Sequence, residues 1–254
     1  PDGSILCFIE ARGGDQIDVL RSTDEGTTWA TAAERVLDIA VNTADIRRIG
    51  AAYNGGQVLL LVSFHDGANF TLAQYASYDR GATFRQIEDD FRAKHTDTKE
   101  PSNASAIGMR GGGFLVAYTD TRNGETHRVG RLGDAAQNAA TMNDVNVAPY
   151  ASADAASLAI FEDNDAEVWA LCHDNTSGHG DLTLLRSVDG GFEFEGVQYS
   201  GNRPVLYSSV GGAAEFKHYT AALSGGRLMI IGKFTGSGNA NDDHSTVVIY
   251  AGGH

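Results

Sequence analysis

A short pattern that recurs three times along the chain constrains its fold more than any other feature. The pattern is S-x-D-x-G-x-x-[W or F], and it occupies residues 22–29, 77–84 and 187–194. Each copy follows a run of alternating β-forming residues. Because chance rarely produces three copies of a spaced pattern, we expect the chain to consist of repeated structural units.

Apolar stretches mark these units. They begin near residues 3, 56, 112, 167 and 226, which gives a period of roughly 50 to 60 residues. A short strand ending in a turn precedes most of them, a third strand follows each, and a fourth stretch closes the unit. Four short strands per unit predict an all-β fold in which each unit is a four-stranded antiparallel blade of a β-propeller. The first unit lacks its leading strand and the fifth stops after its third, so about five blades' worth are present.

The repeated pattern, called the box below, is predicted to fasten the turn between the third and fourth strands of a unit. Its Ser and Asp side chains can hydrogen-bond the turn's own backbone, its Gly permits positive φ, and its aromatic side chain can pack back on the blade. We therefore expect a structural role for the boxes. The third unit has lost its box and keeps only Asp134 in the corresponding turn. The box positions are Ser22, Asp24, Gly26 and Trp29, then Ser77, Asp79, Gly81 and Phe84, and finally Ser187, Asp189, Gly191 and Phe194.

Charge and composition exclude several classes of function. The formal net charge of -14 argues against nucleic acid as a partner, because phosphate binding needs clustered Lys and Arg. No apolar run approaches the roughly 18 to 20 residues that cross a bilayer, so no membrane insertion is expected. An Asp-rich, Lys-poor chain suits a high-salt habitat, although GC-rich coding would produce the same bias.

Metal and cofactor sites are not predicted. No phosphate-binding or dinucleotide-binding motif occurs, and the acidic residues 162–167 fit a hairpin turn rather than a calcium loop. His173 with Asp174, or His179 with Asp181, could contribute to a metal site, but neither pair has an evident third ligand. Cys7 and Cys172 lie within hydrophobic runs, which favours buried free thiols.

The boxes and the stretch GSILCFIEARGGDQIDVLRSTDEGTTW, residues 3–29, resemble the Asp-box (BNR) repeats of sialidases. The resemblance implies a single sialidase-like propeller domain over residues 1–254, belonging to a longer protein whose complete domain has six blades. Asp-boxes also occur in propellers without catalytic activity, so the resemblance carries over the fold more directly than the activity.

The resemblance also implies candidate site residues. In sialidases three arginines clamp the substrate carboxylate, an Asp is the general acid, and a Tyr assisted by a Glu is the nucleophile. The segment SGHGDLTLLRS puts a histidine about where a further arginine is expected, and no F-R-I-P-like segment with the family's first arginine occurs here. The candidate catalytic residues are Asp15, Tyr219 and Glu100, and the candidate substrate-binding residues are Arg12, Arg122, His65 and His179.

Three of these residues have equivalent places in successive units. Arg12, His65 and Arg122 each fall nine residues after a glycine that starts an apolar strand. Equivalent places in successive blades would point around one end of a central funnel, either as a binding rim or as a ring of solvated loops.

The preferred interpretation is a module that binds a carbohydrate or a surface receptor, within an extracellular, cell-surface or virion-surface protein. The alternatives are an exo-sialidase-type glycoside hydrolase acting on an anionic sugar, and a structural propeller without a ligand. The departures from the sialidase pattern favour binding over hydrolysis.

Overall fold

The computed structural model describes residues 4–10, 16–30, 34–38, 45–65, 70–88, 104–120, 126–139, 144–146, 158–163, 165–174, 181–187, 189–196, 205–207, 215–224, 227–235 and 243–251. Within these residues the chain forms antiparallel β-strands in five sheets and contains no α-helix. The described part therefore holds no helix able to span a membrane.

The five sheets follow one another in chain order. Sheet 1 contains β1 (Ile5–Glu10), β2 (Gln16–Ser22) and β3 (Glu34–Asp38). Sheet 2 contains β4 (Asp45–Asn54), β5 (Gln57–His65), β6 (Phe70–Ser77) and β7 (Arg85–Glu88). Sheet 3 contains β8 (Ala104–Gly108), β9 (Phe114–Asp120), β10 (Thr126–Leu132) and β11 (Asp144–Asn146). Sheet 4 contains β12 (Leu158–Glu162), β13 (Val168–Asp174), β14 (Asp181–Ser187) and β15 (Glu195–Gly196), and β16 (Val205–Tyr207) also pairs with β14. Sheet 5 contains β17 (Glu215–Ser224), β18 (Arg227–Thr235) and β19 (Asp243–Ala251).

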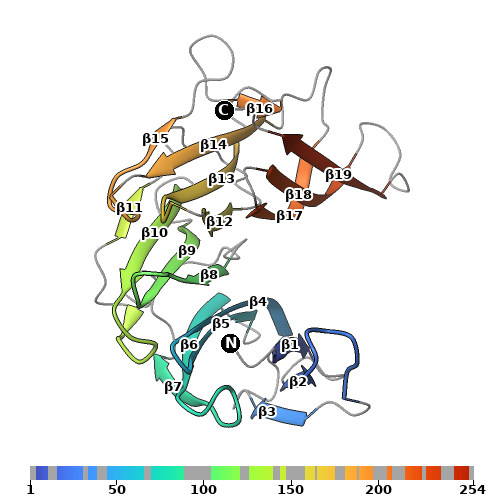
Figure 1. Ribbon diagram of the computed structural model, residues 1–254, viewed down its shortest axis with the longest axis vertical. Helices are drawn as coiled ribbons and strands as arrows, with labels where there is room; N and C mark the ends of the chain where they lie inside the picture. Colours follow the sequence, from blue (N-terminus) through green and yellow to red (C-terminus); the bar gives the residue numbers. More distant parts are fainter. Residues whose placement is uncertain are drawn as a thin grey trace.

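The sheets are arranged around an arc. In Figure 1 they run from the blue sheet 1 to the red sheet 5, with β4, β8, β12 and β17 toward the inside of the arc. These four strands are the first strands of sheets 2 to 5, and they contact one another in that order. Within each sheet the chain then proceeds outward, strand by strand. This radial order is the arrangement that the repeat predicts.

The hydrophobic core lies between neighbouring sheets, so the second strands of sheets 2 and 3, β5 and β9, are buried on both faces. In β5, Leu59 and Leu61 pack in a cluster with Phe114 of sheet 3, whereas Leu60 packs in another cluster with Ile17 of sheet 1. Successive strand residues face opposite sides, and a strand between two other sheets is therefore apolar throughout. Burial of each such side chain stabilises the fold by about 1.5–3 kcal/mol.

Small residues let the inner strands approach closely. A Cβ atom on Gly50 of β4 would lie 2.7 Å from the carbonyl oxygen of Ala104 in β8. A Cβ atom on Gly108 of β8 would overlap the carbonyl oxygen of Tyr53 in β4. The backbones of β4 and β8 thus pack directly on each other, which only glycine permits at these positions.

One prediction about the core was wrong. Cys7 was expected to be buried in its hydrophobic run, but its side chain is exposed and free. Its strand, β1, pairs with β2, and no other strand partner of β1 occurs in the described chain. The side chain of Cys172, in β13, lies outside the description.

Candidate functional site

The alternation of strand directions gives the sheets two different ends. In sheet 2 the turn from β4 to β5 and the box between β6 and β7 lie at one end, because Asn54 pairs with Gln57 and Val58 pairs with Ser77. The connection from β5 to β6 lies at the other end, where His65 pairs with Phe70. We call these the box end and the loop end. All three boxes connect the strands that the repeat names as third and fourth, so they share the box end.

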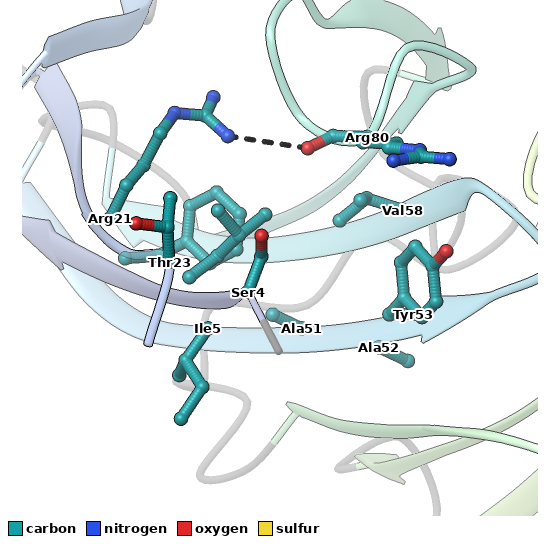
Figure 2. Close-up of a pocket in the computed structure, with 11 residues that line it drawn as sticks. Ser4, Ile5, Arg21, Thr23, Ala51, Ala52, Tyr53, Val58 and Arg80 are labelled. Carbon is teal, nitrogen blue, oxygen red and sulfur yellow. Dashed lines mark hydrogen bonds between the residues drawn. The ribbon is translucent and has the colours of Figure 1, made fainter. Parts of the chain in front are cut away.

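A pocket of about 460 Å³ opens between sheets 1 and 2 at the box end (Figure 2). Side chains of β1, β4 and β5 form its apolar wall, and residues of the first two boxes line its rim. Its lining includes Leu6, Phe8, Ala52, Tyr53, Thr23 and Arg80.

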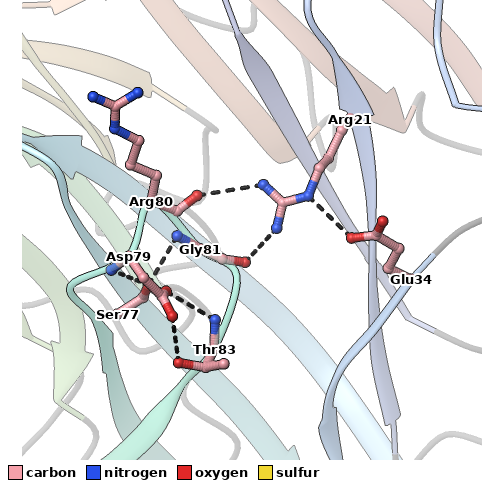
Figure 3. Close-up of polar contacts among 7 residues, drawn as sticks. All are labelled: Arg21, Glu34, Ser77, Asp79, Arg80, Gly81 and Thr83. Atoms are coloured by element: carbon pink, nitrogen blue, oxygen red, sulfur yellow. Dashed lines mark hydrogen bonds and ion pairs between the residues drawn. The ribbon is translucent and has the colours of Figure 1, made fainter.

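Each box is a closed network of hydrogen bonds. In the second box the Ser77 hydroxyl donates to Asp79 Oδ1 (2.7 Å) and accepts from the amide of Gly81 (2.8 Å). Asp79 also accepts from the amide (2.8 Å) and the hydroxyl (2.6 Å) of Thr83, as Figure 3 shows. Gly81 has φ of +80°, a value that favours glycine.

The other two boxes have the same core of contacts. Ser22 donates to Asp24 and accepts from Gly26, and Ser187 and Asp189 are paired in the same way. The aromatic positions differ: Phe84 and Phe194 pack against core clusters, whereas Trp29 is 41% exposed. The box carboxylates are thus occupied by their own turns.

These networks predict an acid-sensitive contribution to stability. The hydroxyl and amide of Thr83 hold the pKa of the Asp79 carboxyl well below its usual value. A carboxyl whose pKa is lowered on folding stabilises the protein above its unfolded pKa of about 3.9, and this contribution is lost as pH falls toward the folded pKa. We expect Asp79→Asn to lower the free energy of unfolding by about 1 kcal/mol at pH 7, since the turn lies in water. In urea titrations the difference in free energy of unfolding between wild type and Asp79→Asn should shrink below pH 4. A difference that stays constant with pH would contradict a lowered pKa of Asp79 in the folded protein.

The box end also holds contacts between sheets. Arg21, the residue before the first box, donates to the carbonyl oxygens of Gly81 (2.6 Å) and Arg80 (3.4 Å) in the second box. Glu34 accepts from its Nε at 3.1 Å. Arg131, at the same position of sheet 3, lies over the Phe192 ring of the third box, with its guanidinium 5.2 Å from the ring centre. An arginine of one sheet therefore contacts the box of the next.

Sheets 2 and 3 are joined differently, because sheet 3 has lost its box. Tyr78 donates to Asp134, and Gln57 donates to the same carboxylate at 3.0 Å. The Tyr78 hydroxyl lowers the pKa of Asp134. Asn54 donates to the carbonyl oxygens of Met109 (2.8 Å) and Gly113 (2.6 Å) in the turn from β8 to β9. The polar groups described at this end are largely engaged in holding one sheet to the next.

The loop end has a different chemistry. We count β1 as the second strand of sheet 1, because Ile5 lies opposite the box serine Ser22 as Val58 of β5 lies opposite Ser77. With this count, the apolar second strands of sheets 1 to 4 end in ionisable residues, which are Glu10, His65, Asp120 and Asp174. Strand pairing adds two more carboxylates, since Asp45 is opposite His65 and Asp181 is opposite Asp174. Glu10 is exposed and His65 is partly exposed. The wholly buried Ser63, two residues before His65, has no hydrogen-bond partner for its hydroxyl among the described residues.

Most of the candidate ligand residues lie outside the described residues. These are Arg12, Asp15, Glu100, Arg122 and His179. Their roles stay predictions.

The described candidates are His65 and Tyr219. Tyr219 is opposite Gly232 in the pairing of β17 with β18, next to a register shift, and its side chain lies outside the description. Ile5 and Val58 lie opposite the box serines of sheets 1 and 2, and Arg12 and His65 each come seven residues after them. In sheet 3 the corresponding position is Phe114, opposite Leu132, and Arg122 comes eight residues after it. By strand register Arg12 and His65 are therefore equivalent, and Arg122 is shifted by one residue. The glycine count had placed all three at the same position.

Sequence reasoning missed Asp120 as a candidate and considered Asp174 only with His173, as part of a metal site. Both close an apolar strand as Glu10 does, and an alignment of the strand ends, rather than of the starting glycines, would have found them. Among the described residues no three His, Cys, Asp or Glu side chains gather as a metal site. The acidic residues 162–167 lie at the turn from β12 to β13, where Asp163 accepts from the amides of Asp165 and Glu167.

Comparisons with known proteins identify the fold. No protein-family model matches the sequence, and no curated protein matches it significantly. The chain is similar to the solved structure of a GH93 α-L-arabinofuranosidase of Fusarium graminearum with arabinobiose (11% identity, TM-score 0.64, 99% of this chain and 72% of that chain). It is also similar to an α-L-arabinanase of Penicillium chrysogenum complexed with arabinobiose (12%, 0.61, 98% and 71%) and to a GH43 β-1,3-galactosidase (13%, 0.60, 98% and 54%). This chain has a β-propeller fold. The propeller predicted from the repeat is confirmed, and the chain spans between 54% and 72% of the lengths of these structures.

Proposed function

We propose that this chain is a carbohydrate-binding β-propeller module and that the sugar binds at the loop end. The observation that carries the proposal is the common ending of the second strands. Four apolar strands of successive sheets end in Glu10, His65, Asp120 and Asp174 at the end opposite the boxes. The equivalent strand of sheet 5, β18, ends in Thr235, so the ionisable ending is shared by sheets 1 to 4.

The chemistry of this end suits hydroxyl groups. Carboxylates accept hydrogen bonds from hydroxyls, and an imidazole can donate or accept, so neighbouring strand ends offer several contacts to one sugar ring. The box end is less suitable because the carboxylates of Asp79, Asp134 and Asp189 already accept hydrogen bonds from their own turns or from the neighbouring sheet.

The narrower proposal is a sugar that bears a carboxylate. Arg12 and Arg122 follow the second strands of sheets 1 and 3 in the sequence, and a guanidinium binds a carboxylate through two parallel hydrogen bonds. On a chain with a net charge of -14, an anionic ligand needs such local cations. We further propose that the module belongs to a larger extracellular, cell-surface or virion-surface protein, where glycans are available as ligands.

A hydrolase is the second candidate, and the names of the similar structures support it. The similar structures include enzymes named as an arabinofuranosidase, an arabinanase and a galactosidase. Hydrolysis would require Asp15 as general acid and Tyr219 with Glu100 as nucleophile and assisting base. In that case Tyr219→Phe abolishes turnover of a fluorogenic glycoside, and a binding module shows no turnover at all.

The proposal predicts the effect of substitutions at the loop end. Binding of 3′-sialyllactose and of arabinobiose is measured by calorimetry for wild type, Glu10→Gln and His65→Ala. Each substitution should weaken binding by about tenfold or more, because a hydrogen bond to a charged group contributes about 1.5–3 kcal/mol. A preference for sialyllactose supports the carboxylate-bearing sugar, and a preference for arabinobiose supports a neutral one.

The matched control is Glu25→Gln, which makes the same chemical change at an exposed position of the first box. It should leave the affinity unchanged. If Glu25→Gln weakens binding as much as Glu10→Gln does, the sugar does not bind at the loop end. If neither sugar nor any member of a glycan array binds the wild-type chain, the structural propeller without a ligand replaces the proposal.

A further inference from the structure

Strand β1 occupies the second place in its sheet although no strand is described in the first. The box serine lies opposite the start of the second strand in each box-bearing sheet, in the pairs Val58 with Ser77, Val168 with Ser187 and Ile5 with Ser22. By this register β1 is equivalent to β5 and β13. Those two strands each have an inner partner, β4 and β12, whereas β1 pairs with β2 alone among the described strands. Within the described residues, one edge of β1 is therefore open where its equivalents carry an inner strand.

The burial of β1 differs in the same way. Its sequence ILCFIE is as apolar as that of its equivalents, yet none of its residues is buried and Ile5 is 40% exposed. In β5 every residue from Val58 to Phe64 is buried. Strand β1 thus has the composition of a central strand but the exposure of an edge strand. We conclude that a neighbouring strand is missing beside it.

The pocket at the box end lies beside this open edge. Its lining includes Ile5, Leu6 and Phe8 of β1 and Ala51 to Tyr53 of the inner strand β4. Figure 2 labels Ile5, Ala51, Ala52 and Tyr53 among them. Between sheets 2 and 3 the corresponding inner strands touch backbone to backbone, as the contact of Gly50 with Ala104 shows. Between sheets 1 and 2 a cavity of about 460 Å³ separates β1 from β4 instead.

We propose that the open edge of β1 and this pocket form the seat of one extended strand. The strand pairs antiparallel with β1 and packs small and apolar side chains against Ala51, Ala52 and Phe8. Its source is polypeptide continuous with this chain, because in sheets 2 to 5 the inner strand directly precedes its second strand and a short turn joins them. Added backbone hydrogen bonds remove the exposed edge, and the added side chains fill the cavity.

The experiment supplies the strand from the chain's own repeat. Residues 1–3 are replaced by a copy of residues 45–56, so that Ser4 follows the copied Gly55–Gly56 turn as Gln57 does in sheet 2. Hydrogen exchange of the amides of β1 should slow by about tenfold or more, because a strand paired on both edges exchanges only when it opens. The thermal midpoint should rise by about 3 °C or more. Exchange in β9, which already has two partners, should not change.

The matched control carries the same extension with the copy of Ala51 replaced by proline, which cannot complete the ladder. It should show neither slower exchange nor a higher midpoint. Equal effects of the two extensions, or no effect of the intact one, would overturn the proposal. Two further outcomes also overturn it: slow exchange in β1 of an unextended dimer, which makes a second copy the occupant, and protection of β1 by arabinobiose, which makes the pocket a sugar site.

Discussion

Gly108→Ala should lower the free energy of unfolding by about 3 kcal/mol or more, because the added methyl group has no room. Gly108 lies in β8, where the inner strands of sheets 2 and 3 meet. A Cβ atom there would overlap the carbonyl oxygen of Tyr53 and lie 2.9 Å from its carbonyl carbon. Both atoms belong to the backbone of β4, so no side-chain rotation relieves the overlap, and the two inner strands must move apart.

The measurement is urea-induced unfolding, followed by circular dichroism. Gly111→Ala is the control, because Gly111 lies in the turn that follows β8 and a Cβ atom there meets nothing within 4 Å. Its effect should stay within about 0.5 kcal/mol of wild type. Equal stabilities of the two variants would mean that the inner strands do not pack through their backbones.

Gln74→Met should cost about 3 kcal/mol or more, for a polar rather than a steric reason. Gln74 is fully buried in β6, and its amide nitrogen donates to the carbonyl oxygens of Ala135 and Gln137, each at 2.8 Å. Its side-chain oxygen accepts from the amide of Ala139 at 2.8 Å. Methionine has a similar volume but replaces none of these bonds, so three backbone groups of the segment that follows β10 lose their partner between sheets 2 and 3.

The loss is measured by urea unfolding, with Gln86→Met as the control. Gln86 lies in the next strand of the same sheet and is exposed, so the same replacement there should be nearly neutral. The slope of the unfolding transition should be unchanged in both variants, since only stability is altered. A Gln74→Met variant as stable as Gln86→Met would show that water replaces the lost hydrogen bonds.

Sheet 3 makes contacts with sheet 2 that the sequence repeat could not predict. In the sequence this sheet has lost its box and keeps only Asp134 in the corresponding turn. In the structure Asp134 accepts hydrogen bonds from Tyr78 and Gln57, and Gln74 binds the backbone just after it. Sequence reasoning could not find these contacts because their partners are more than fifty residues away and belong to another sheet.

Cys7 shows the same limit for burial. A hydrophobic run predicts a buried strand only if both faces and both edges are covered, and cover is a property of neighbours rather than of the run. The candidate ligand residues show the same limit of local sequence patterns. The repeat predicts that Arg12 and His65 occupy equivalent positions, but whether they face one ligand depends on loop conformation, which no local pattern specifies.

The sequence by itself determined the β-propeller fold, the four-strand unit and the place of each box. These properties are local, because alternating apolar residues and the Ser, Asp and Gly of a turn act within a few positions of one another. Only the tertiary structure decided which polar groups bind the next sheet, which apolar strand stays uncovered, and which strand ends share the loop end. Those properties depend on how separate sheets pack, and packing joins residues that the sequence keeps far apart.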